Sequence, residues 1–223
     1  MKRTGDLFED LSAELGCIYI SDLRLPPYRE IACQSLISGQ FSGYPVSMWR
    51  DMLNYLDVES SAEVENLKEF VFVETEGDVD DNIRMLTRRL REKTIDVGVI
   101  GIGENAHIAF NDPPADFDTK QAYIIVNLDS RCKKQQVGEG WFKDEDEVPR
   151  QAVSMTPYQI MQCAHIISPV PHKVKADAVK KVLSAKTVDP MVPGSLLKTH
   201  PDFQLFLDEE SAANCSEEML AGN

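Results

Sequence analysis

Three side chains that can exchange or direct protons lie close together in one short stretch of the chain. His107 carries an imidazole, which takes up and releases protons near neutral pH. Asp112 follows it and offers a carboxylate, and Asn105 precedes it with an amide that both donates and accepts hydrogen bonds. These residue types at this spacing are typical of general acid–base chemistry.

The residues before this cluster predict the element that positions it. Residues 94–103 begin as a continuous apolar run and end on Gly101-Ile-Gly103. This pattern is typical of a strand buried on both faces that passes into a tight turn. Ligands of open α/β sheets bind just past the carboxyl ends of the strands. We therefore expect His107, Asn111 and Asp112 to lie in an active site. A histidine without a role on an ordinary loop is the weaker alternative.

A dinucleotide-binding loop is a second alternative for the same glycines. Gly101-x-Gly103-x-x-Ala106 fits the dinucleotide fingerprint, and Asp129 lies near the position of a ribose-binding acid. That fingerprint requires a helix that starts at the glycines, so that its amino end faces the pyrophosphate. Pro113-Pro114 leaves too few residues for such a helix. We expect no dinucleotide and no other cofactor.

Apolar runs with strand composition alternate with helical patterns along the chain. This alternation predicts an α/β fold: a mostly parallel, doubly wound sheet with helices on both faces. The predicted strands are residues 17–23, 69–74, 96–102, 123–128, 165–170 and 203–208. The predicted helices cover residues 48–56 and 83–90, a segment capped by Thr156-Pro157 that runs through residue 164, and residues 174–182.

The composition excludes several classes of function. The formal net charge of −14 argues against nonspecific binding to nucleic acid or to an anionic membrane, because both require a basic surface. The charge does not exclude a phosphorylated small molecule in a locally basic pocket. No apolar stretch is long enough to cross a bilayer, and the amino end lacks the apolar segment of a signal peptide.

The cysteines and histidines point to a reducing compartment and to no metal site. The five cysteines are scattered and include no C-x-x-C pair, which predicts reduced thiols in a cytoplasmic protein. The four histidines show no H-E-x-x-H spacing and no cysteine partners, so the sequence does not support a metal site.

The stretch that holds the three side chains resembles the loop of the glucosamine-6-phosphate deaminase family. That loop reads approximately Gly-x-Gly-x-Asp/Asn-Gly-His-Ile-Ala-Phe-Asn-Glu/Asp-Pro, and residues 101–113 read Gly-Ile-Gly-Glu-Asn-Ala-His-Ile-Ala-Phe-Asn-Asp-Pro. The related 6-phosphogluconolactonases would carry a Thr-Ala-Ser-Leu-Phe-Pro-like run after the histidine. The resemblance extends from about residue 67 to residue 213. It leaves residues 1–66 as an atypical amino-terminal part and residues 214–223 as a frayed tail.

The resemblance implies aldose–ketose isomerisation with deamination of an amino-sugar phosphate, within carbohydrate metabolism and in the hydrolase and isomerase classes. His107 matches the family's ring-opening histidine, Asp112 an acidic partner, and Asn105 a position where the best-known members hold aspartate. Lys175 matches a lysine that contacts the phosphate, and Gly103 belongs to the substrate-binding loop. The implied partner is a phosphorylated amino sugar, and the resemblance is compatible with a homo-oligomer.

Two features of the family pattern are missing. The phosphate-binding arginine of the family falls on Gln136, and the first sixty-odd residues show neither the Ser/Thr-rich phosphate loop nor the carboxylate that moves the carbon-bound proton. Asp22 is the one candidate for that carboxylate, and a surface acid is its better interpretation. A catalytically silent homologue that binds a sugar phosphate or a partner protein is therefore the alternative hypothesis.

Overall fold

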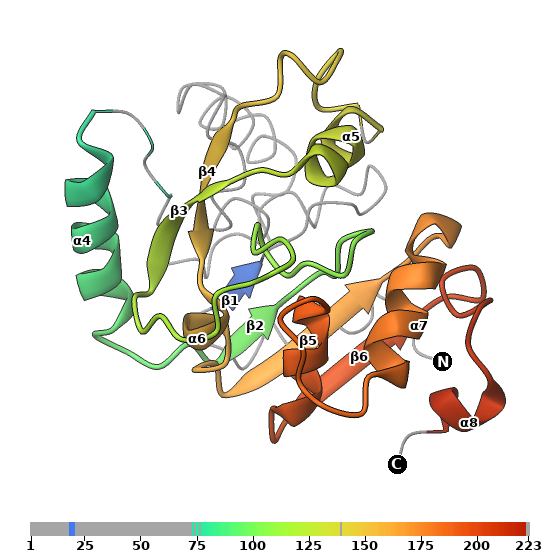
Figure 1. The fold of residues 1–223 in the computed structure, drawn as a ribbon. Coiled ribbons are helices and arrows are strands. Elements are labelled where there is room, and N and C mark those ends of the chain that lie inside the picture. Colours follow the sequence, from blue (N-terminus) through green and yellow to red (C-terminus); the bar gives the residue numbers. More distant parts are fainter. Residues whose placement is uncertain (1–17, 21–72, 74, 76, 139, 222–223) are drawn as a thin grey trace, which may run out of the picture.

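A four-stranded parallel sheet organises the protein (Figure 1). The computed structural model describes residues 18–20, 73, 75, 77–138 and 140–221. The strand order is β1-β2-β5-β6, and each neighbouring pair runs parallel. The strands are β1 (Ile18–Ile20), β2 (Val97–Val99), β5 (His165–Val170) and β6 (Phe203–Leu207).

The structure confirms the α/β class and the open, mostly parallel sheet. Four of the predicted strands, at residues 17–23, 96–102, 165–170 and 203–208, are found in this sheet as β1, β2, β5 and β6. All three residues of β2 are buried, as expected for a strand covered on both faces. The predicted strand at residues 69–74 and the predicted helix at residues 48–56 fall almost wholly outside the described residues.

Two further strands form a separate antiparallel pair. In it β3 (Tyr123–Asn127) pairs with β4 (Gln151–Met155), with Tyr123 opposite Met155. The sequence predicted β3 but not β4. Strand β4 buries Ser154 together with its apolar neighbours, so its five residues show neither a continuous apolar run nor an alternation of apolar and polar positions.

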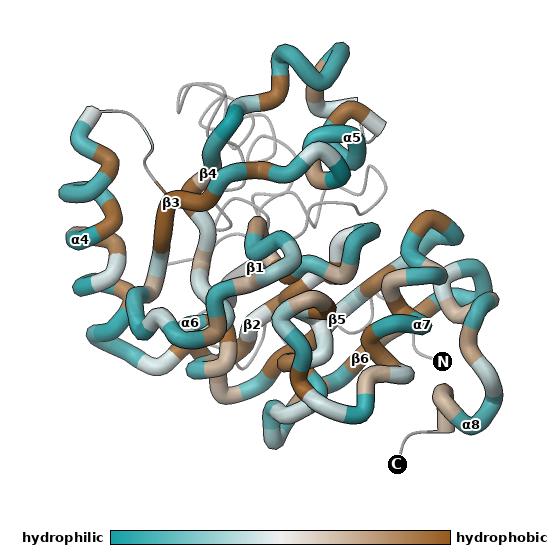
Figure 2. Tube along the Cα trace, in the orientation of Figure 1, coloured by the Kyte–Doolittle hydropathy of each residue, from teal (hydrophilic) through white to brown (hydrophobic). Residues whose placement is uncertain are grey.

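Helix α4 (Val79–Leu90) confirms the helical pattern predicted at residues 83–90. The side chain of Asp78 caps its first turn by accepting a hydrogen bond from the backbone N–H of Asp81. Leu86 is buried whereas Met85 is exposed, and Figure 2 shows hydrophobic and hydrophilic residues interspersed along this helix. The amphipathic face explains why the segment folds against β3.

Helix α6 (Pro157–Ile160) begins as predicted but is shorter than expected. Thr156 accepts a hydrogen bond from the backbone N–H of Gln159, and Pro157 occupies the first turn. The predicted end at residue 164 is wrong. The backbone N–H of Cys163 bonds instead to the carbonyl of Ile160, three residues back, and the chain enters β5 at once.

The remaining helical segments lie between β3 and β4, between β5 and β6, and after β6. Helix α7 (Ala176–Ser184) buries Val179 and Val182 and lies over one face of the sheet (Figure 1). Val174 was predicted on the same apolar face but is 58% exposed, because it belongs to the preceding 3-10 turn. The other helical segments are α5 (Ser130–Gly138), the 3-10 turns η2 (Lys173–Lys175) and η3 (Pro193–Thr199), and α8 (Glu217–Leu220).

The hydrophobic core reaches from the sheet into the loop that follows β2. Ile100 and Ile102 are fully buried, and so is Ile108 inside the loop. A loop that contributes core side chains is held in place by packing as well as by hydrogen bonds. Within the described part of the chain, every helix is too short or too polar to span a membrane.

Candidate active site

The loop with the three predicted catalytic residues lies at the carboxyl edge of the parallel sheet. It follows β2 and folds back on itself through isolated bridges from Ile108 to Ile102 and from Ile108 to Asn111. No helix starts at Gly101 or Gly103, and the next helix along the described chain is α5. The dinucleotide interpretation therefore fails, as the sequence indicated.

The tight turn of this loop depends on a residue that the sequence did not single out. Ala106 has a φ of 70°, in the left-handed region, and its N–H donates to the carbonyl of Gly103 at 2.9 Å. The matching family position is glycine, which adopts this conformation at no steric cost. Neither Gly101 nor Gly103 has a positive φ, so the left-handed conformation of the turn lies at Ala106.

Gly103 is needed for a different reason, which is its contact with His107. A Cβ atom placed on Gly103 would lie 2.2 Å from His107 Nε2, far inside van der Waals contact. The imidazole thus packs directly against the glycine backbone. The structure brings Gly103 and His107 together, and any larger residue at position 103 would displace the ring.

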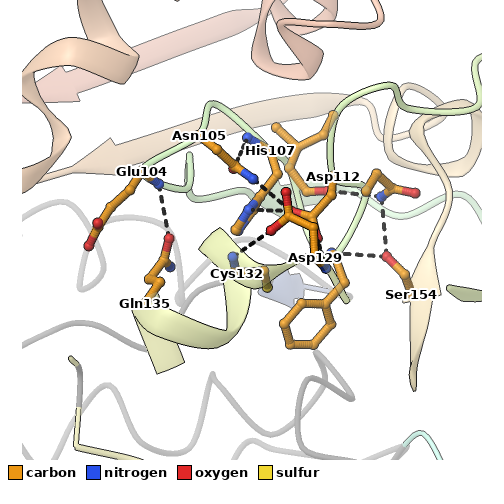
Figure 3. Close-up of polar contacts among 11 residues, drawn as sticks. Glu104, Asn105, His107, Asp112, Asp129, Cys132, Gln135 and Ser154 are labelled. Carbon is orange, nitrogen blue, oxygen red and sulfur yellow. Dashed lines mark hydrogen bonds and ion pairs between the residues drawn. The ribbon is translucent and has the colours of Figure 1, made fainter. Parts of the chain in front are cut away.

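His107 and Asp112 form a buried pair. His107 Nδ1 lies 3.0 Å from Asp112 Oδ1, and each side chain is only 7% exposed (Figure 3). The distance suits an ion pair, although Nδ1 has no well-aligned hydrogen bond to any group of the structure. With Nδ1 turned toward the carboxylate, Nε2 is the ring nitrogen left for a substrate.

Asn105 connects the two members of this pair. Its Nδ2 donates to Asp112 Oδ1 at 2.9 Å, and its Oδ1 accepts from the backbone N–H of His107 at 3.1 Å. The sequence suggested that Asn105 orients the imidazole. In the structure it contacts the backbone of His107 and reaches the ring only through Asp112.

The environment of Asp112 favours the charged carboxylate. Burial by itself would raise the pKa of Asp112, but the contact with His107 and the hydrogen bond from Asn105 act in the opposite direction. The backbone N–H of Asp129 also donates to Asp112 Oδ2 at 3.2 Å. The net result is a pKa below the usual value for aspartate. Asp112 therefore faces the imidazole as an anion at neutral pH.

Three elements from later parts of the chain hold the loop. The side chain of Gln135 on α5 accepts from the backbone N–H of Glu104 at 3.0 Å. Ser154 on β4 accepts from the backbone N–H of Phe110 at 3.0 Å. The N–H of Gly194 in η3 donates to the carbonyl of Ala106 at 2.9 Å. These residues were missed because they lie far from the loop in sequence and carry no motif of their own.

Asn111 has a structural place rather than a chemical one. Its amide donates to the carbonyls of Ile108 and Met155, each at 2.8 Å, and it is 3% exposed. These bonds fasten the end of the loop to β4. The side chain is therefore occupied, in contrast to the ring of His107.

Lys175 is a buried lysine at the same edge of the sheet. It is 2% exposed, and its Nζ has no hydrogen-bond partner in the part of the chain that the structure describes. It lies in η2, just past the carboxyl end of β5, and β5 neighbours β2 in the sheet. Lys175 and the His107 loop thus follow adjacent strands at the same edge. An uncompensated buried ammonium is costly, which indicates a site for an anion.

The sequence analysis also named residues and bounds outside this loop. Gln136, at the position of the family arginine, is buried on α5 and presents an amide where the family has a positive charge. Asp22 and the small-residue segment 38–43 lie outside the described residues. The division at residues 66 and 213 remains a prediction, and the segment expected to be a frayed tail contains α8.

Several curated proteins are similar to this chain. A glucosamine-6-phosphate deaminase of Staphylococcus epidermidis is 37% identical over 121 residues, which cover 54% of this chain and 48% of the relative. One from Lactobacillus johnsonii is 35% identical over 136 residues, covering 61% and 55%. The chain spans about half the length of these relatives. No protein-family model matches it.

Solved structures are also similar to this chain. A monomeric glucosamine-6-phosphate deaminase aligns with a TM-score of 0.59 at 27% identity, over 65% of this chain and 58% of that chain. A 6-phosphogluconolactonase from Thermotoga maritima aligns with a TM-score of 0.60 over 91% and 88%, but at 12% identity this shows the fold alone.

The comparisons correct one expectation and confirm another. The hydrolase class is wrong, because the curated relatives are deaminases and the lactonases enter as distant neighbours in fold. The similarity supports the isomerase and deaminase part of the expectation. Over roughly half of its length, this chain is thus similar to the glucosamine-6-phosphate deaminases, the family that its loop at residues 101–113 resembles.

Proposed function

We propose that the protein binds a phosphorylated amino sugar and catalyses its aldose–ketose isomerisation with release of ammonia. The observation that carries the proposal is the buried contact between His107 and Asp112, in a loop at the carboxyl edge of the sheet. The similarity to glucosamine-6-phosphate deaminases supports glucosamine 6-phosphate as the first substrate to test.

His107 has the geometry of a proton shuttle. Opening of the sugar ring requires a proton to reach the ring oxygen, and an imidazole can deliver it near neutral pH. The charged Asp112 faces Nδ1 and stabilises the imidazolium that forms whenever the ring takes up a proton. The absence of a side chain at Gly103 lets the ring pack against the glycine backbone without being displaced. Asn105 holds the carboxylate in place through its amide.

The later steps require a second group. A proton must leave the carbon that bears the amine and reach the neighbouring carbon, after which ammonia departs. This transfer requires a carboxylate near the substrate, and Asp22 is the candidate that the sequence offers. Lys175 supplies the positive charge for the phosphate, as its burial without a partner supports.

The decisive experiment is to incubate the protein with glucosamine 6-phosphate and measure ammonia. His107→Asn should reduce the rate about 10²–10⁴-fold, the usual contribution of a general acid–base group. His165→Asn is the matched control, because His165 begins β5 at the opposite edge of the sheet and pairs with Asp202 in a half-exposed contact. It should leave the rate unchanged.

Two outcomes would contradict this assignment. Ammonia release that survives His107→Asn would remove His107 from the mechanism. Binding of glucosamine 6-phosphate by the wild-type protein without any ammonia release would favour the catalytically silent homologue.

Location and assembly are also part of the proposal. The thiols of Cys132, Cys163 and Cys215 are not in disulfides, which supports a reducing, cytoplasmic environment. Fractionation of the source cells tests the location. Light scattering on the purified protein distinguishes a monomer from the homo-oligomer with which the resemblance is compatible.

A further inference from the structure

Helix α5 brings a cysteine to the buried pair. Cys132, in the first turn of α5, lies beside His107 and Asp112 (Figure 3), and one ligand atom from each of the three residues lies within 4.8 Å of the other two. We expected no metal site from the sequence, because no cysteine is near His107 along the chain. The fold supplies that cysteine from a different element.

The donor set fits a borderline-soft transition-metal ion. An imidazole nitrogen, a carboxylate oxygen and a thiolate sulfur are the ligands that zinc prefers, whereas magnesium and calcium favour oxygen alone. Tetrahedral zinc holds its ligand atoms roughly 3.5 Å apart, given Zn–N and Zn–S bonds of about 2.0 and 2.3 Å. The observed separations therefore require only small side-chain rotations to close around an ion.

Hydrogen bonds from neighbouring residues hold the cluster in place. Asp129 accepts from the backbone N–H of Cys132 at 2.6 Å, and its own N–H donates to Asp112 Oδ2. Asn105 bonds to the other oxygen of Asp112. Outer partners of this kind orient ligands in metal sites.

The imidazole gives a second, independent indication. His107 is 5% exposed, and although its Nδ1 lies 3.0 Å from Asp112 Oδ1, it makes no well-aligned hydrogen bond within the described residues, so this nitrogen has capacity for another partner. Buried polar atoms are nearly always satisfied in native proteins. A cation bound between the three side chains would satisfy it.

We propose that His107, Asp112 and Cys132 bind one divalent transition-metal ion of the zinc type, with a fourth position for water. Binding converts the thiol of Cys132 to a thiolate, whose proton passes to solvent. The ion occupies an imidazole nitrogen and the carboxylate that the proposed reaction uses, so it inhibits that reaction. The inhibition rests on the proposed function, whereas the binding does not.

The test measures metal binding by the full chain after treatment with a chelator. Equilibrium dialysis should give one equivalent of Zn²⁺, and Co²⁺ used as a probe should show the charge-transfer absorption of a cobalt–thiolate bond. Cys132→Ser should abolish that absorption and weaken Zn²⁺ binding by at least about tenfold, and His107→Asn should weaken it as well. Cys215→Ser is the matched control, because Cys215 is a partly exposed thiol outside the cluster, and it should bind as the wild type does.

The proposal is overturned if wild-type protein shows no cobalt–thiolate absorption, or if Cys132→Ser binds Zn²⁺ as tightly as the wild type. Because Cys132 is 1% exposed, circular dichroism must show that the variant is folded, and Cys132→Ala provides a second substitution. If neither variant folds, the cobalt spectrum of the wild type decides alone. A protein that releases no ammonia but binds the ion would refute the proposed function and leave this inference intact.

Discussion

At the scale of single residues, Asp112 is held by contacts on both carboxylate oxygens. Oδ1 faces His107 and accepts from Asn105, and Oδ2 accepts from the backbone of Asp129. Burial disfavours the charged carboxylate, whereas the three contacts favour it. The contacts have the larger effect, so the pKa of Asp112 is lowered. The charge of this carboxylate is thus part of what stabilises the folded loop.

This balance predicts a pH-dependent contribution to stability. A carboxyl group whose pKa is lower in the folded state stabilises the protein above its unfolded-state value, about 3.9, and loses this contribution as the pH falls through the folded-state pKa. The stabilising contribution of the Asp112 carboxylate, measured as the unfolding free energy of the wild type minus that of Asp112→Asn, should therefore decrease as the pH is lowered through this range. Urea unfolding at a series of pH values measures it.

Asp118→Asn provides the control for this prediction, because Asp118 is exposed. Its difference from the wild type should stay nearly constant over the same range. If Asp112→Asn also showed a constant difference, the carboxylate would not be stabilised by its contacts.

Gly103 allows a separate prediction about the position of the imidazole. Gly103→Ala places a methyl group where the His107 ring lies, so the ring must move and the proposed activity should fall by at least about tenfold. Gly138→Ala is the control, since a Cβ there meets no atom within 4 Å and Gly138 has no positive φ. Steady-state kinetics and thermal unfolding of both variants separate loss of activity from loss of fold. Unchanged kinetics in Gly103→Ala would refute the assigned contact.

At the scale of elements, the end of α7 depends on a side chain from η3. Lys198 Nζ donates to the carbonyls of Val182, Leu183 and Ala185, at 3.1, 3.1 and 2.6 Å. The last carbonyls of a helix lack partners within the helix and carry partial negative charge, so an ammonium group there is favourable. This contact joins α7 to the segment that also holds the turn at Ala106.

Replacing this lysine should loosen that junction. Lys198→Met keeps much of the side-chain volume but removes the three hydrogen bonds, and we expect a loss of about 1 kcal/mol in unfolding free energy. Lys186→Met, at a nearby exposed position, should change stability by less than about 0.5 kcal/mol. Chemical denaturation of the two variants compares them directly. Equal effects would show that the hydrogen bonds contribute nothing specific.

The elements also show how far sequence reasoning reaches. Strand β5 was predicted at its observed bounds because it holds three β-branched apolar residues, Ile166, Ile167 and Val170, and α4 because its pattern is strongly amphipathic. Strand β4 was not predicted, because Val153 is its one β-branched residue and its longest apolar run is Ala152-Val153. His107, Asp112 and Asn105 were found because they are neighbours in one loop. Gln135 and Cys132 were not, because only the fold brings α5 to that loop.

At the scale of the whole molecule, a strongly acidic chain buries the ammonium of Lys175, which has no hydrogen-bond partner among the described residues. The formal net charge is −14, yet Lys175 is 2% exposed and lies at the same edge of the sheet as the His107 loop. An anionic ligand would meet repulsion from the molecule as a whole and attraction at this position. Local charge therefore has to decide its binding, because the total charge opposes it.

Lys175→Met tests whether this ammonium serves a ligand. Removing an unpaired buried charge should leave the unfolding free energy of the ligand-free protein unchanged or higher. Affinity for glucosamine 6-phosphate should fall at least about tenfold, as loss of a charged hydrogen bond costs about 1.5–3 kcal/mol. Thermal unfolding and calorimetric titration measure the two quantities. Lys173→Met, in the same turn but exposed, should change neither. Lower stability with unchanged affinity would make Lys175 a structural residue.

The residues that hold the His107 loop are synthesised after the loop itself. Gln135, Ser154 and Gly194 all follow the loop in the chain. The loop therefore emerges from the ribosome well before the residues that shape it, and a nascent chain released before η3 would carry His107 and Asp112 without their complete support. Contacts over such sequence distances form slowly, because the intervening chain must first be ordered. The pair formed by His107 and Asp112 thus gains its complete set of contacts only after residue 194 has been synthesised, although both residues lie near the middle of the sequence.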